Sequence, residues 1–183
     1  MKKNITLLSV LFFLLTSCRD SDIGFITAQP NSLEEIDFIP NNFQGKFVLY
    51  GYNDTITITE KTIDGININT DSLIVKSQGN YLFVNMKKKD YYSLFAAQVV
   101  KSYNFEKISL HEFFIQNIVK GDYISMVDSI SEKEINDLII KDNNLNISKY
   151  DSLSEQFIID KLSVNQFQML LNNSQITDVK RLY

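Results

Sequence analysis

Cysteine and histidine, the side chains best suited to nucleophilic and acid-base chemistry, each occur once in this sequence, as Cys18 and His111. An imidazole works as a general base when a second group orients it. The neighbour of His111 is Glu112, and in an extended segment adjacent side chains point to opposite faces. Glu112 is then poorly placed to orient the ring. We interpret His111 as a structural or surface residue, and without a Gly-x-Ser-x-Gly motif no Ser-His-Asp site is indicated.

The acidic residues give little support for a metal site or for paired acid-base catalysis. The segment Asp142 to Asn146 begins like a calcium-binding EF-hand loop, but the sixth position is Ile147 instead of Gly and the twelfth is Leu153 instead of Glu. No spacing fixes two carboxylates across a cleft. The available carboxylates are Glu34, Glu35, Asp37, Glu132, Glu134, Asp151 and Glu155. We expect no metal ion, and without a glycine-rich phosphate loop we expect no cofactor.

The surroundings of Cys18 indicate a different role for the thiol. Lys2 and Lys3 precede the segment Ile5–Leu15, which is apolar apart from Thr6 and Ser9, as in a secretory signal peptide. A helix of this length rises about 16 Å, which is about half of the hydrocarbon core of a bilayer. The segment therefore predicts export rather than a transmembrane anchor.

The four residues that end this segment, Leu15-Thr16-Ser17-Cys18, resemble the lipobox of bacterial lipoproteins. The resemblance implies cleavage between Ser17 and Cys18, attachment of diacylglycerol to the Cys18 thiol and usually a further acyl chain on its amine, with palmitate among the acyl groups. Two or three chains hold a protein stably on a membrane, whereas one holds it reversibly. The alternative is a free cysteine that follows a cleaved signal or a short anchor.

The negative charge of the chain indicates which partners and which location to expect. The formal net charge is −4, and loss of Lys2 and Lys3 makes it −6, which disfavours nucleic acid and anionic lipid headgroups. Membrane contact is then expected through the lipid alone. The acidic segment 19–22 loosely resembles the signal that sends lipoproteins to the outer face of the outer membrane in some Gram-negative lineages, although a solvated linker has the same composition. We expect a lipid-anchored envelope protein, most simply at the outer membrane, with its periplasmic or surface face left open.

The sequence divides into three expected segments. A signal peptide covers residues 1–17, a lipidated tether covers 18–38, and one globular domain covers 39–183. The tether is expected because residues 19–38 are acidic and show no sustained period. The remaining length is close to the usual size of one domain.

Between about residues 44 and 110 the sequence alternates β-branched or aromatic residues with polar ones. The expected strands are 46–52, 55–59, 72–77, 81–86, 91–100 and 105–110. Turns are indicated by Asn53-Asp54, by Asp64-Gly65 and by Gln78-Gly79-Asn80. Short strands at this spacing predict an antiparallel meander that curls into a partial barrel or packs against helices.

The C-terminal third predicts a helix, a strand and a second helix. Ser131 to Glu134 and Ser163 to Gln166 both have the form of a capping box ahead of apolar residues at helical spacing. The helices are expected at about 132–141 and from 163 to about 172, with a strand at 156–160 between them. Together with the meander, this region predicts an α+β fold class.

These features favour a membrane-anchored envelope lipoprotein whose domain is a non-enzymatic binding or accessory module. The chain resembles small Gram-negative envelope lipoproteins, and that resemblance implies no activity. The expected partners are the membrane, through the lipid, and another envelope protein. Two alternatives stay open: a structural spacer or surface coat, and a hydrolase whose carboxylates are brought together by the fold.

Overall fold

The computed structural model describes residues 23–49, 55–102, 105–114, 145, 147–151 and 156–182. These residues form one twelve-stranded sheet, the 3-10 helix η1 (Asn41–Phe43) and the α-helix α4 (Val164–Asn172). The strands are β1 (Ile23–Phe25), β2 (Gly45–Leu49), β3 (Thr55–Ile58), β4 (Thr62–Ile63), β5 (Ile66–Asn67), β6 (Leu73–Gln78), β7 (Tyr81–Lys87), β8 (Tyr92–Ser102), β9 (Phe105–Glu112), β10 (Ile147–Asp151), β11 (Gln156–Ile159) and β12 (Gln175–Leu182). In this part of the chain no helix is long and apolar enough to cross a membrane.

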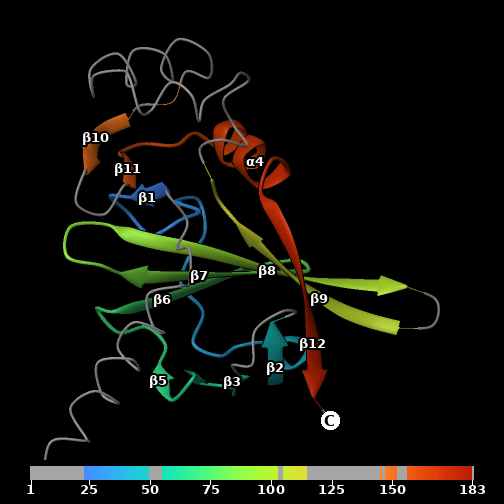
Figure 1. Cartoon of the computed structure of the whole chain (residues 1–183). Helices are drawn as coiled ribbons and strands as arrows, with labels where there is room; N and C mark the ends of the chain where they lie inside the picture. The colour runs from blue at the N-terminus through green and yellow to red at the C-terminus, as the bar shows by residue number, and fades with distance from the viewer. Residues whose placement is uncertain are drawn as a thin grey trace, which may run out of the picture.

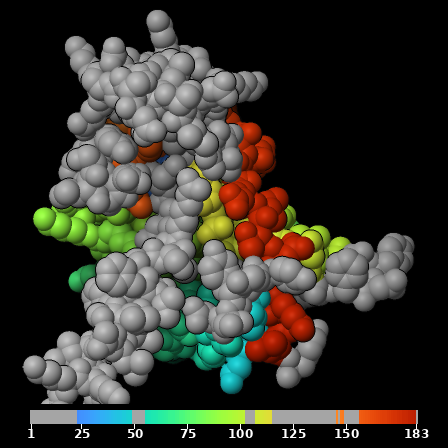
Figure 2. All heavy atoms as spheres, viewed as in Figure 1, coloured from blue at the N-terminus to red at the C-terminus, as the bar shows by residue number. Residues whose placement is uncertain are grey.

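Two antiparallel meanders make up most of the sheet, and β12 joins them. Strands β6 to β9 form the central meander, and β2 to β5 form a smaller one. The first half of β12 pairs with β9 and its second half with β2. In Figure 2 the residues of α4 and β12 appear as red surface running down this face of the molecule, so part of the strand that joins the two meanders is exposed there.

Strand β8 is the longest, and its partners change along its length. One edge of β8 pairs with β7, while the other edge pairs first with β1 and then with β9. On its far side β1 pairs in parallel with β11, the one parallel pair among the described strands, and β11 pairs with β10. The N-terminal strand is thus enclosed between elements that lie far apart in the sequence.

The tight turns follow the local sequence signals. Asp64 and Gly65 connect β4 to β5 with φ angles of 53° and 79°, which is the left-handed pair that a two-residue hairpin turn requires. Gly79 opens the turn from β6 to β7 with a φ of 60°. Both turns are confirmed at the predicted places.

Two hydrophobic cores lie on opposite faces of the central meander, and Figure 1 shows the elements that lie on each side of it. On one face lie α4, β1, β10 and β11, and we call the residues buried there the helix-side core: Ile23, Phe25, Phe83, Leu94, Ala96, Phe113, Leu145, Ile147, Phe157, Ile159, Phe167, Leu170 and Leu171. On the other face lie β2 to β5, and the residues buried there form the hairpin-side core: Ile39, Phe43, Phe47, Ile68, Leu73, Val75, Leu82, Val99 and Ile108. Side chains alternate along each strand, so that Leu82 and Phe83 serve different cores.

The predicted α+β class is wrong, because the described chain is mostly β. The C-terminal region contains β10, β11, α4 and β12, so strands outnumber helices in its described part. The capped helix after Ser163 and the strand near 156–160 are confirmed as α4 and β11. The helix predicted at 132–141 lies outside the described residues, as do the signal peptide and Cys18.

The tether prediction is wrong for residues 23–38. Ile23 and Phe25 are fully buried in β1, and Glu35 and Ile36 pair with the outer edge of β6. Ile23 and Phe25 belong to the helix-side core, whereas Ile36 packs against the hairpin-side core, so the segment is part of the domain although it is rich in acidic residues. A tether is left only for residues before Ile23.

The hairpin predicted at Asn53-Asp54 has a different register. A two-residue turn there would pair Tyr52 with Thr55, but Val48 pairs with Thr55 and Phe47 with Ile56. This register buries Phe47 in the hairpin-side core. Burial of one face fixes strand register more strongly than a turn dipeptide does.

Candidate binding groove

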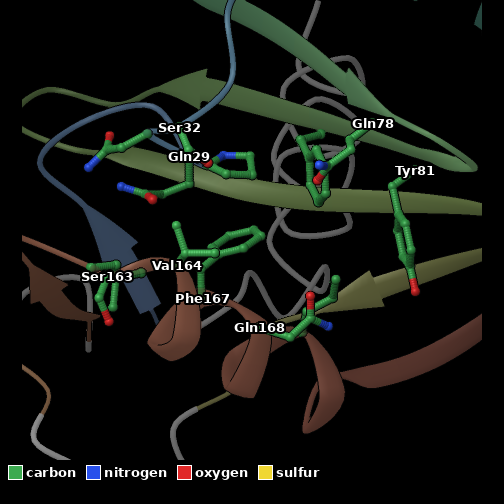
Figure 3. A pocket seen from close by; sticks show the side chains of 13 residues that line it. Gln29, Ser32, Gln78, Tyr81, Ser163, Val164, Phe167 and Gln168 are labelled. Carbon is green, nitrogen blue, oxygen red and sulfur yellow. The ribbon is translucent and has the colours of Figure 1, made fainter.

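A groove with a volume of about 570 Å³ lies between α4, the end of the β6–β7 hairpin and the loop that follows β1 (Figure 3). This is within the usual range for sites that bind small ligands. The described residues that line it are Gln29, Pro30, Asn31, Ser32, Gln78, Tyr81, Phe83, Leu162, Ser163, Val164, Phe167, Gln168 and Leu171. Amide, hydroxyl and apolar side chains make up this lining, and no charged side chain is among the described members.

One wall of the groove is the loop at residues 28–32, which two buried side chains of the central meander hold in place. Lys76 on β6 donates from Nζ to the carbonyls of Ala28 and Pro30, both at 3.0 Å. Asn85 on β7 accepts from the backbone N–H of Gln29 at 2.7 Å and donates to its carbonyl at 2.8 Å. Four backbone groups of three consecutive residues are therefore fixed by side chains, and the wall is preorganised.

Lys76 is committed to this structural task. Only 7% of the residue is exposed, and burial lowers the pKa of its ammonium group while the negative charge of Glu35 raises it in part. The two carbonyl acceptors replace some of the water that the ammonium loses. The lysine thus holds the loop on the side that faces the sheet, and it is not among the residues that line the groove.

Gln29 is fixed at the groove but retains one unpaired atom. Its Nε2 donates to the carbonyl of Thr27 at 3.1 Å and to the Thr27 hydroxyl at 3.2 Å. Since a carbonyl can only accept, this bond determines which end of the amide is nitrogen. Oε1 is buried without a hydrogen-bond partner, and the residue is 1% exposed. An unpaired buried acceptor costs about 1–3 kcal/mol, so a donor that reached it would relieve that cost.

The opposite wall is one face of α4. Val164, Phe167, Gln168 and Leu171 are spaced as one stripe of an α-helix and all line the groove. The helix begins at Ser163, whose side chain accepts from the Gln166 N–H while the Gln166 side chain accepts from the Ser163 N–H. Val164 is 67% exposed at the mouth of the groove.

The floor consists of aromatic rings that contact one another. Phe83 lies edge-on to Phe167 with ring centroids 5.5 Å apart, and it stacks with Tyr81 at 5.8 Å. Phe83 and Phe167 are buried. Their ring faces are thus largely covered by neighbours, and the exposed apolar surface at the mouth comes from Val164.

His111 lies on the same face of the sheet but has a structural environment. Its Nδ1 donates to the Ser174 hydroxyl at 2.7 Å, because that hydroxyl itself donates to the carbonyl of Leu171 at 2.7 Å. Nε2 lies 3.3 Å from the side-chain amide of Gln98. Burial lowers the pKa of the imidazole. These contacts link β9 to the chain that leaves α4.

The other residues singled out from the sequence are not brought together. Glu34, Glu35 and Asp37 are exposed on the segment before η1. The side chain of Glu112 lies within 3.5 Å of the Thr177 hydroxyl. Among the residues that the structure describes, no three His, Cys, Asp or Glu side chains are grouped as a metal site would need. The remaining candidates lie outside the described residues or have undescribed side chains: Ser17, Cys18, Glu132, Glu134, Asp142, Asp151 and Glu155.

Sequence reasoning missed the residues that build the groove. Lys76 and Asn85 each interrupt a strand of apolar residues. Ile74 lies two positions before Lys76 and Phe83 two positions before Asn85, so each polar residue shares a strand face with an apolar one. A lone polar residue at an inward position of a strand signals a buried polar contact, although not its partner. The partner, Gln29, was assigned to the tether. Comparison with protein-family models, with curated proteins and with solved structures found no match in any of the three.

Proposed function

We propose that this protein is a lipid-anchored envelope protein whose domain binds a ligand reversibly in the groove beside α4. The observation that carries the proposal is the preorganised wall: buried Lys76 and Asn85 hold the loop around Gln29 in one conformation. Preorganised sites bind more tightly because little freedom is lost on binding. A fixed loop facing an exposed apolar helix residue is an arrangement that supports binding.

The lining also favours binding over catalysis. Tyr81 is the one titratable side chain among the described lining residues, and the Ser163 hydroxyl is engaged with Gln166 in the helix cap. A hydrolase needs a nucleophile or an acid-base pair positioned at the reacting atoms. We therefore assign no chemical step to the groove.

The envelope location rests on the lipobox-like sequence at Leu15 to Cys18. Cells grown with an alkynyl fatty acid should label the mature protein, and Cys18→Ala should lose both the label and the processing. The control is Ser21→Ala, which lies outside the lipobox and should keep both. Label that persists in Cys18→Ala would contradict the lipid anchor.

The groove is tested by photo-crosslinking in cells. A photoreactive amino acid at exposed Gln168, on the groove face of α4, should give discrete adducts with a ligand or partner. Val164→Glu places a charge at the mouth of the groove and should reduce these adducts at least tenfold. The matched control is Ile176→Glu, because Ile176 is 59% exposed on β12 and does not line the groove. Adducts that are absent, or equal in both variants, would contradict the proposal and favour a structural spacer.

A further inference from the structure

The described lining selects against charged ligands. A charged group that entered the groove would lose water and meet no opposite charge among the lining residues. The nearest buried cation, Lys76, is already bound to the carbonyls of Ala28 and Pro30. An uncharged ligand loses less hydration energy on entering the groove and needs no opposite charge there.

The unpaired Oε1 of Gln29 can accept a hydrogen bond from a ligand. Figure 3 shows Gln29 on the loop, across the groove from Ser163 and Val164 on the other wall. The backbone contacts to Asn85 and the bonds from Nε2 to Thr27 leave this side chain little freedom to turn away. A backbone N–H of a peptide is a neutral donor of suitable strength.

The remaining polar side chains suit a peptide in the same way. The groove presents several further amides, each of which offers one donor group and one acceptor as a peptide unit does: Asn31, Gln78 and Gln168. Such amides can pair with the N–H and C=O of an extended backbone. This is the main-chain recognition that extended peptides use on protein surfaces.

The apolar part of the groove favours an aliphatic or aromatic side chain over a sugar ring. A sugar would stack on an open aromatic face, but Phe83 lies against both Tyr81 and Phe167, and the half-buried ring of Tyr81 also contacts that of His111. The exposed apolar surface at the mouth is that of Val164. An apolar side chain needs only such surface, without a ring face.

The dimensions agree with a short extended segment. From Val164 to Leu171 the helix rises about 10 Å, which is the length of about three residues of an extended chain. The width is bounded by the fixed loop on one side and α4 on the other.

We propose that the groove binds an uncharged, extended segment of a partner protein, with one apolar side chain beside Val164 and one backbone N–H donating to Oε1 of Gln29. This inference rests on the proposed binding function of the groove. It adds the chemical class of the ligand and the atom that receives its hydrogen bond.

The test uses the full lipidated chain in detergent micelles with methyl-labelled Val and Leu. The probes are terminally blocked pentapeptides Ser-Gly-X-Gly-Ser in which X is Leu, Phe, Asp or Lys, and the disaccharide maltose. Saturable NMR shifts of the Val164 and Leu171 methyl groups report binding. The Leu or Phe peptide should bind at least tenfold more tightly than the Asp and Lys peptides, and maltose should cause no shift.

Variants assign the contacts. Val164→Glu should weaken binding of the Leu or Phe peptide at least tenfold, Val164→Thr should stay within about threefold, and Ile176→Glu should have no effect. Gln29→Met removes Oε1 and should weaken binding at least fivefold, with the methyl spectrum as the check on folding. The exposed Val164 variants decide the outcome if Gln29→Met fails to fold.

The alternative outcomes are distinct. Saturable shifts from maltose or from the Asp or Lys peptide, without shifts from the Leu and Phe peptides, would overturn the peptide class and leave groove binding intact. No saturable shift from any probe would also overturn the peptide class. The crosslinking experiment in cells tests groove binding independently of the peptide class: adducts from Gln168 that are lost in Val164→Glu support binding in the groove.

Discussion

The two faces of the central meander are built by the same four strands, yet they bury different chemistry. The hairpin-side core is lined along these strands by apolar residues such as Leu82 and Val99. The helix-side face mixes an apolar core with buried Lys76, Asn85 and His111. Each of these polar residues contacts an element that β6 to β9 do not contain: the loop around Gln29 or the chain that leaves α4.

This difference indicates a division of labour between the two faces. Apolar contacts stabilise a fold without requiring one particular arrangement of a distant loop. Hydrogen bonds from buried side chains are directional, and they specify where the loop and helix lie. The hairpin side therefore mainly supplies stability, while the helix side also shapes the groove.

A substitution in the hairpin-side core should cause the greatest loss of stability. Leu82→Ala removes a fully buried side chain from a close-packed site and should lower the free energy of unfolding by about 2–5 kcal/mol. Chemical denaturation measures this loss. The yield of Gln168 adducts per folded molecule should stay as in the wild type. A lower yield per folded molecule would show that the hairpin-side core also shapes the groove.

Asn85→Leu is the matching change on the helix side. It leaves the N–H and the carbonyl of Gln29 without their partner, which should cost about 1–3 kcal/mol. Hydrogen exchange at the Gln29 amide should accelerate at least tenfold beyond the global change, and adducts from Gln168 should fall. Leu82→Ala is the control, because it should accelerate exchange at Gln29 only as far as global stability falls. If exchange at the Gln29 amide and the Gln168 adducts changed equally in Asn85→Leu and Leu82→Ala, the two faces would not differ in this way.

How far the sequence predicts this architecture depends on how local each signal is. Strands β6 to β9 and helix α4 were predicted within a few residues, because their turns and cap lie in contiguous sequence at Gly79 and Ser163. Strand β12 was missed, since its apolar residues Ile176, Val179 and Leu182 recur every third position and it is held by backbone pairing with β9 and β2. Pairing between distant segments leaves little trace in local periodicity.

The candidate groove was not predictable for a related reason. Its polar contacts join Gln29 to Asn85 and the Ala28 carbonyl to Lys76, and in each case the partners lie far apart in sequence. Local reading assigned Gln29 to a tether because acidic residues surround it. The apolar residues of β1, Ile23 and Phe25, are too few to show a period, so nothing local marks this segment as part of the domain.

A pH-dependent effect separates His111 from the groove. Burial lowers the pKa of His111 in the folded protein, so below the ordinary histidine pKa the unfolded chain binds a proton that the folded chain does not. The stability from this site is present above the ordinary pKa and is lost as the pH falls through the folded pKa. His111→Gln should therefore show a smaller loss of stability between about pH 8 and about pH 5 than the wild type. Denaturant melts at both pH values measure this, and an unchanged pH dependence would contradict it.

The smallest effect on stability is expected at the mouth of the groove. Val164→Glu places an acidic residue in the first turn of α4, where the helix dipole favours negative charge, so the free energy of unfolding should change by less than about 1 kcal/mol. Thermal denaturation compared with Val164→Thr measures the change. A larger loss would mean that the variant disturbs the helix itself, and its adduct loss would then report folding.

A crosslinking scan of both faces in cells determines whether the helix side carries the binding site. Photoreactive residues replace Asn31 and Gln168 at the groove, and Phe38 and Ile66 on the hairpin side, all four of them exposed. We expect partner adducts at Asn31 and Gln168 and none at Phe38 or Ile66. Adducts from the hairpin side alone, or equally from all four positions, would contradict it.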